Sequence, residues 1–171
     1  MKGTVIGVAM LLAAIAQVTV APLFPVAGSV PELVLLGLVL LAAFSSPSPV
    51  MVVTPLVAVA LAFLSDRSPG LLLLAYLPLL PLGFALEESS VPLNHYVRTL
   101  AMMVVTGVWL RTLLALGAMA GGATPAFSLL VSDVLVPGLL LDAALLTVVY
   151  IPMRLAGWSG RGMTLQRSRY Y

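Results

Sequence analysis

The chain contains no cysteine and only one histidine, His95. Without cysteine there is no disulfide, no thiolate metal site and no cysteine nucleophile. A single histidine also leaves too few of the usual ligands for a zinc site. We therefore expect neither a metal nor any other cofactor.

Charge is scarce as well. Only 8% of the 171 residues are charged, whereas 61% are hydrophobic. A soluble domain has about 25% charged residues. Because so little polar surface cannot cover a water-soluble particle, we predict that lipid is the solvent for much of this protein. The polar C-terminal segment is too short to be a nucleic-acid-binding module.

The apolar runs predict an all-α, polytopic membrane helix bundle with six transmembrane helices. Helices of about 20 residues joined by short loops would use the whole chain and leave no room for a second domain. Residues 1–156 would form the six-span transmembrane domain, and residues 157–171 a short basic cytoplasmic tail. The predicted spans are 4–23, 31–44, 50–64, 71–86, 97–119 and 126–155.

Turns and loops separate these spans. Serine, glycine and proline mark turns at 45–49 and 121–125, and the most polar loop, 87–96, contains His95. Prolines within the spans predict kinks, chiefly at Pro78 and Pro81 in the fourth span and at Pro137 in the sixth.

Two alternatives remain open in the N-terminal third. Lys2, the apolar stretch after it and an A-x-A site at Ala14 to Ala16 also fit a cleaved signal peptide. The apolar run continues past that site, however, which favours a first transmembrane helix. The segments 31–44 and 50–64 are short for a full crossing and could instead form a re-entrant hairpin, which would leave four spans.

Basic residues predict the orientation of the bundle. With six spans, the side that holds both termini carries Lys2, Arg98, Arg154, Arg161, Arg167 and Arg169. The other side carries only Arg67. Since basic residues favour the cytoplasmic side, we predict that both termini are cytoplasmic. The basic tail either contacts anionic lipid or is simply solvated.

Ionisable residues inside the predicted spans are few. Such a residue costs about 2.5–3.5 kcal/mol at the bilayer centre unless it faces a partner or water. Arg111 lies about 20 Å above the cytoplasmic start of its span, and Asp133 about 10 Å below the outer surface. These depths coincide in a core about 30 Å thick, so we predict an Arg111–Asp133 pair. Other polar residues at or above that height would complete an outer cluster: Gln17, Glu32, Asp66 and Arg67.

Asp142 is nine residues after Asp133, so it points to nearly the opposite face of the same helix. Its nearest expected mates within the chain are His95 and Arg98. These intramembrane polar residues could serve only helix packing, or they could bind a ligand, an ion or a partner protein.

Enzyme motifs are absent from the sequence. It has no phosphate-binding G-x-x-x-x-G-K-[ST] loop. Ser89, Ser90 and His95 share a loop, but no acidic residue is placed to orient the histidine in a triad. Asp133 and Asp142 face apart, which argues against an intramembrane aspartyl protease. We therefore expect a protein that is not an enzyme.

Four short motifs give the chain a family resemblance: the glutamine in Ala16-Gln17-Val18-Thr19, the opening Pro31-Glu32-Leu33, the pattern Asp66 to Gly70 followed by leucines, and Asp142 among small and aliphatic residues. In these features the sequence resembles the rod-shape-determining protein MreD family. It departs from the family pattern in having no glycine in 50–64 and an aspartate where asparagine is usual in the last span.

The resemblance implies a non-enzymatic scaffold subunit in the bacterial cytoplasmic membrane. Its direct partner would be an MreC-like single-span protein, and its indirect partners MreB, RodA and the associated transpeptidase. Together they would organise peptidoglycan synthesis during cell elongation. The outer polar cluster would then dock or stabilise MreC.

Two other functions remain as alternatives. One is the substrate-binding S component of an energy-coupling-factor vitamin transporter, to which the Ala9-x-x-x-Ala13 spacing is similar. For such a transporter subunit, the outer loops of this chain are poor in the aromatic and polar groups that a vitamin pocket would need. The other is a small ion or solute carrier, although no internal repeat with paired broken helices is present.

Overall fold

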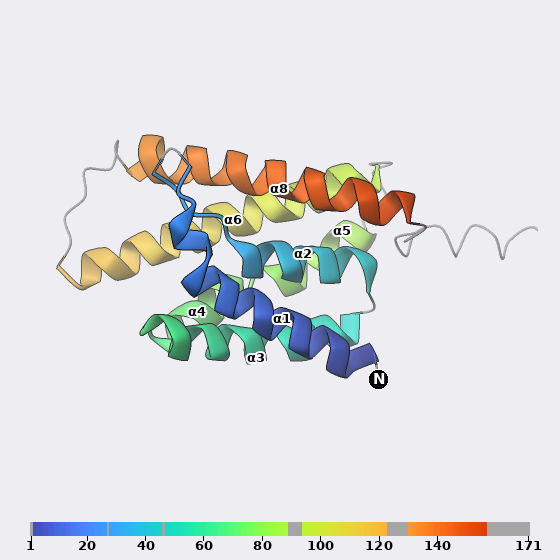
Figure 1. The fold of residues 1–171 in the computed structure, drawn as a ribbon, viewed down its shortest axis with the longest axis horizontal. Helices are drawn as coiled ribbons and strands as arrows, with labels where there is room; N and C mark the ends of the chain where they lie inside the picture. The colour runs from blue at the N-terminus through green and yellow to red at the C-terminus, as the bar shows by residue number, and fades with distance from the viewer. Residues whose placement is uncertain (1, 27, 46, 89–93, 123–129, 157–171) are drawn as a thin grey trace, which may run out of the picture.

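The computed structural model describes residues 2–26, 28–45, 47–88, 94–122 and 130–156 (Figure 1). All regular elements in these ranges are helical, in agreement with the predicted all-α class. The predicted tail, 157–171, and part of the predicted turn at 121–125 lie outside the described residues. The elements are α1 (Lys2–Thr19), the 3-10 helix η1 (Ala21–Leu23), α2 (Leu33–Phe44), α3 (Pro47–Ser65), α4 (Pro69–Tyr76), α5 (Leu79–Glu88), α6 (His95–Ala120), the π-helix η2 (Leu130–Leu135) and α8 (Val136–Leu155).

Helix α2 forms the centre of the bundle. It is apolar on all sides, which is typical of a helix enclosed by protein or by lipid. Helices α1 and α3 pack on one side of it and α6 and α8 on the other (Figure 1). Val34, Leu35, Leu38 and Val39 consequently have no exposed surface.

Within the described residues, three segments are long and apolar enough to cross a membrane: Thr4–Leu23, His95–Ala120 and Val131–Leu155. The other apolar helices are shorter, at Leu33–Phe44, Pro49–Ser65 and Pro69–Phe84. The start of α1 and the end of α8 lie at the same end of the bundle, which we call the terminal end (Figure 1). The opposite end, where α1 leads into α2, is called the far end.

Several helix boundaries differ from the predicted ones. Helix α3 begins at Pro47, because proline is well tolerated in a first helical turn, so the predicted turn at 45–49 is too long. The prediction that His95 lies in a loop is wrong. His95 is the first residue of α6, and the Asn94 side chain caps that helix by accepting a hydrogen bond from the Tyr96 amide at 3.3 Å.

The predicted kinks at Pro78 and Pro137 coincide with changes in the helices, whereas Pro81 lies within the uninterrupted helix α5. The apolar segment 71–86 is divided into α4 and α5 at Leu77–Pro78. Because proline has no N–H, Pro78 leaves the Leu74 carbonyl without its usual helical donor. The Trp109 indole of α6 donates to that carbonyl at 3.0 Å. The break is therefore satisfied by a neighbouring helix, as membrane helices with proline require.

The same arrangement occurs where η2 meets α8. Pro137 leaves the Asp133 carbonyl without its helical donor. The Ser29 hydroxyl donates to this carbonyl at 3.3 Å and to the Val134 carbonyl at 3.0 Å. Ser29 is held in a tight turn by paired backbone hydrogen bonds with Val26, and Gly28 adopts the positive φ of 81° that the turn needs.

Candidate functional site

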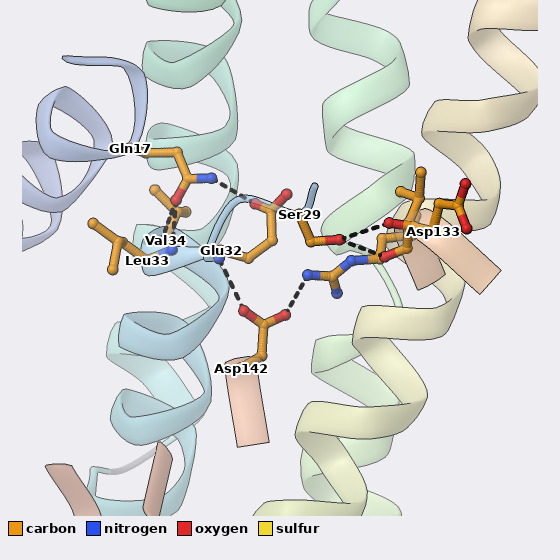
Figure 2. A network of polar contacts seen from close by, with 9 residues as sticks. Gln17, Ser29, Glu32, Leu33, Val34, Asp133 and Asp142 are labelled. Atoms are coloured by element: carbon orange, nitrogen blue, oxygen red, sulfur yellow. Dashed lines mark hydrogen bonds and ion pairs between the residues drawn. The ribbon is translucent and has the colours of Figure 1, made fainter. Parts of the chain in front are cut away.

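A largely buried polar network joins four elements, α1, α2, α6 and α8 (Figure 2). It lies in the half of the bundle nearer the far end, since its residues come late in α1 and α6 and early in α2 and α8. Its first member, Gln17, lies in the last turn of α1. The Gln17 amide nitrogen donates to the Glu32 carboxylate at 2.8 Å. The Gln17 amide oxygen accepts from the backbone amides of Leu33 and Val34. These amides belong to the first turn of α2, where no helical acceptor exists, so a side chain of α1 caps α2.

Asp142 of α8 is the centre of the network. One carboxylate oxygen accepts from the backbone amide of Glu32 at 2.9 Å, and the other pairs with the Arg111 guanidinium at 2.6 Å. The Asp142 side chain is only 1% exposed and that of Arg111 only 6%. A single carboxylate thus connects α8 to both α6 and the start of α2.

Two glycines make room for the Arg111 guanidinium. A Cβ atom at Gly138 would lie 2.5 Å from the guanidinium Nε, closer than real Cβ contacts allow. A Cβ atom at Gly107 would lie 3.3 Å from Nη1 of the same group. The guanidinium therefore rests on the backbone of α8 one helical turn before Asp142, and this approach requires glycine at position 138.

The predicted Arg111–Asp133 pair is wrong, because Arg111 pairs with Asp142. Height along the bundle does not reveal which face of α8 meets α6. That face is buried and carries residues at four-residue spacing: Gly138, Asp142, Leu146 and Tyr150. Asp133 lies on nearly the opposite face, is exposed, and accepts a hydrogen bond from the Ser132 hydroxyl at 2.6 Å.

The expected mates of Asp142, His95 and Arg98, are also wrong, because both lie near the terminal end. His95 contacts the Tyr150 hydroxyl at 2.7 Å through Nδ1 and the Ala43 carbonyl at 3.1 Å through Nε2. Phe44 lies against both rings, with centroid distances of 5.5 Å to His95 and 5.4 Å to Tyr150. Helix α2 is therefore held by polar contacts at both of its ends.

The predicted outer cluster is partly confirmed. Gln17, Glu32 and Arg111 do converge, as their predicted heights suggested. Asp66 and Arg67 are exposed in the connection between α3 and α4, and within the described parts of the chain neither side chain hydrogen-bonds to the network. Pro137-Gly138 was predicted only as a kink in the sixth span, and the contact of Gly138 with Arg111 was not foreseen. The role of Ser29 was not foreseen either, although Pro137 was a signal that a nearby carbonyl would need another donor.

The chemistry of the network is that of a clamp. Its polar groups bind one another across α1, α2, α6 and α8. Across the ranges given above, no group of three His, Cys, Asp or Glu residues is placed to hold a metal ion. Arg111 Nη1 is buried and has no hydrogen-bond partner among the described residues, so the network is not completely satisfied.

The Ser29 contact gives a first test of how the far end is held. Ser29→Ala should lower the free energy of unfolding by about 1–3 kcal/mol, because the Asp133 and Val134 carbonyls of η2 lose the donor that Ser29 supplies. The matched control is Thr112→Ala, since the exposed Thr112 hydroxyl bonds only to Val108 within its own helix. Unfolding in detergent, followed by circular dichroism, measures both variants. Equal effects at the two positions would contradict the role assigned to Ser29.

Comparison with protein-family models, with curated proteins and with solved structures gives no match for this chain. Functional assignment therefore depends on the residues themselves. What they offer is a polar network that connects four elements.

Proposed function

We propose that this chain is an MreD-like, non-enzymatic scaffold subunit of the bacterial cell-elongation machinery. The observation that carries the proposal is the convergence of Gln17, Glu32 and Asp142. Each belongs to one of the motifs that resemble the family, yet they are separated by 15 and 110 residues in sequence. Their direct contacts give the separate motifs one shared structural reason to occur together.

The proposed membrane arrangement has six spans and both termini in the cytoplasm. The common position of the α1 start and the α8 end supports an even number of crossings (Figure 1). Arg98 and Arg154 belong to the terminal end, and Arg67 to the far end. This distribution supports a cytoplasmic terminal end by the positive-inside rule. Helix α2 is short, but its enclosure by protein shields it from the lipid.

The proposed role is to present a fixed helix surface to an MreC-like single-span protein. Through that protein the chain would be connected to MreB, RodA and the transpeptidase, and so to peptidoglycan synthesis. A rigid clamp at the far end suits a scaffold, because a docking surface made of several helices keeps its shape only if those helices are held in register.

Affinity purification of the intact chain in mild detergent tests the proposal. We expect an MreC-like protein to co-purify with the wild type and with the exposed-site control Asp133→Asn. Asp142→Ala should lose most of that partner, because the helices it clamps shift. Recovery of an ATPase and a coupling subunit, or of a bound vitamin, would overturn the proposal in favour of the transporter S component.

A further inference from the structure

Two arginines, Arg98 and Arg154, belong to the terminal end of the bundle. Arg98 is three residues after His95 on α6, and Arg154 is four residues after Tyr150 on α8. His95 and Tyr150 touch at 2.7 Å, so their helix faces are opposed. Long helical side chains lean toward the N-terminus of their own helix. Because α6 and α8 are antiparallel, this lean turns the two arginines toward each other, and both charges act on His95.

The Arg154 guanidinium has no counter-charge among the described residues. Arg154 as a whole is half-buried. Its Nη1 atom is fully buried and has no hydrogen-bond partner among the described residues. Buried polar groups are normally paired, so an unpaired guanidinium nitrogen points to an acceptor supplied from outside. Four of the six acids cannot be that acceptor, because they belong to the far half: Glu32, Asp66, Asp133 and Asp142.

We propose that Arg154, supported by the nearby positive charge of Arg98, binds the phosphate of an anionic phospholipid headgroup in the leaflet at the terminal end. The planar guanidinium fork matches phosphate oxygens, and basic recesses between membrane helices are typical sites for anionic headgroups. The rings of Tyr96 and Tyr150 lie 5.2 Å apart at the same end of the bundle, and amphipathic rings of this kind suit the membrane border. The site depends on the membrane placement proposed above and not on the identity of a protein partner.

Native mass spectrometry of the intact chain, released from detergent after incubation with defined lipids, tests the site. We expect phosphatidylglycerol to be retained about tenfold more tightly than phosphatidylcholine, since charge-assisted bonds favour the anionic headgroup. Arg154→Gln should weaken phosphatidylglycerol retention about tenfold. Arg67→Gln is the matched control, because it removes the same charge from an exposed far-end position and should leave retention unchanged.

Three outcomes would overturn the proposal. The first is equal retention of phosphatidylglycerol by the wild type and Arg154→Gln. The second is protection from thermal unfolding by inorganic phosphate but not by the lipid, which would indicate a free-phosphate site. The third is lipid retention that appears only in Glu87→Gln/Glu88→Gln, which would mean that the glutamates ending α5 already neutralise the arginines.

Arg154→Lys guards against misfolding as an explanation. It keeps the positive charge and should fold normally, but it lacks the guanidinium fork. We expect it to retain phosphatidylglycerol at a level between those of the wild type and Arg154→Gln. The site would be contradicted if Arg154→Lys retained phosphatidylglycerol no better than the wild type retains phosphatidylcholine. Because these readouts need no partner protein, their failure is distinguishable from failure of the MreD-like function.

Discussion

Replacing Asp142 with alanine should lower the free energy of unfolding by about 3–5 kcal/mol, because the substitution leaves the Arg111 charge buried without a partner. The Glu32 backbone amide loses its acceptor in the same variant. Replacing both members of the pair, as Arg111→Leu/Asp142→Leu, should recover most of the lost stability, because no unpaired charge then remains. Unfolding with a denaturing detergent, followed by circular dichroism or proteolysis, measures these differences.

The control for this prediction is Asp133→Ala. Asp133 is exposed and forms no ion pair with the described residues, so we expect a change of at most about 0.5 kcal/mol. A charge swap at Arg111 and Asp142 should retain more stability than either single replacement, whereas a swap at Arg111 and Asp133 should not. Equal losses for Asp142→Ala and Asp133→Ala would show that the buried pair does not hold the far end.

A single methyl group at position 138 should have the second large effect. Gly138→Ala would place Cβ 2.5 Å from Arg111 Nε, so the guanidinium must leave the α8 backbone and its position beside Asp142. We expect a loss of about 3 kcal/mol, because overpacking is added to a weakened ion pair. Gly7→Ala is the matched control. Nothing lies within 4 Å of its added Cβ, and alanine should stabilise that helical position by about 0.5–1 kcal/mol.

The energetic coupling between positions 138 and 111 distinguishes a clash with the Arg111 guanidinium from general crowding of the core. In a double-mutant cycle, Gly138→Ala should cost much less when position 111 is already leucine, since the clashing group is gone. Fully additive losses in the double variant would mean that the methyl group clashes with something other than the guanidinium.

The sequence was a good guide to helix position and height. Continuous apolar runs and prolines located the end of α2 and the break before α5. A rise of about 1.5 Å per residue gave heights for Gln17 and Arg111 that agree with their convergence. These quantities follow from local structure, so they can be estimated without knowing which helices are neighbours.

Height alone could not decide whether Asp133 or Asp142 pairs with Arg111. It depends on which face of α8 packs against α6, and that face is decided by the packing of Leu146 and Tyr150 as much as by the charges. The π-helical turn before Pro137 also changes the facing of Asp133 relative to a regular helix. The His95 error was of another kind, because Asn94 was a recognisable cap residue whose signal was available in the sequence.

The carbonyls freed by proline also impose an order on biosynthesis. Ser29 is translated 104 residues before the Asp133 carbonyl that it serves, so the donor is already present when the acceptor emerges. For the Leu74 carbonyl the order of synthesis is reversed, because its donor, Trp109, is translated 35 residues later. At about 5–20 residues per second the ribosome needs about 2–7 seconds to supply it. During that interval the Leu74 carbonyl must accept a hydrogen bond from water or from the insertion machinery. In the finished protein the Trp109 indole donates that bond.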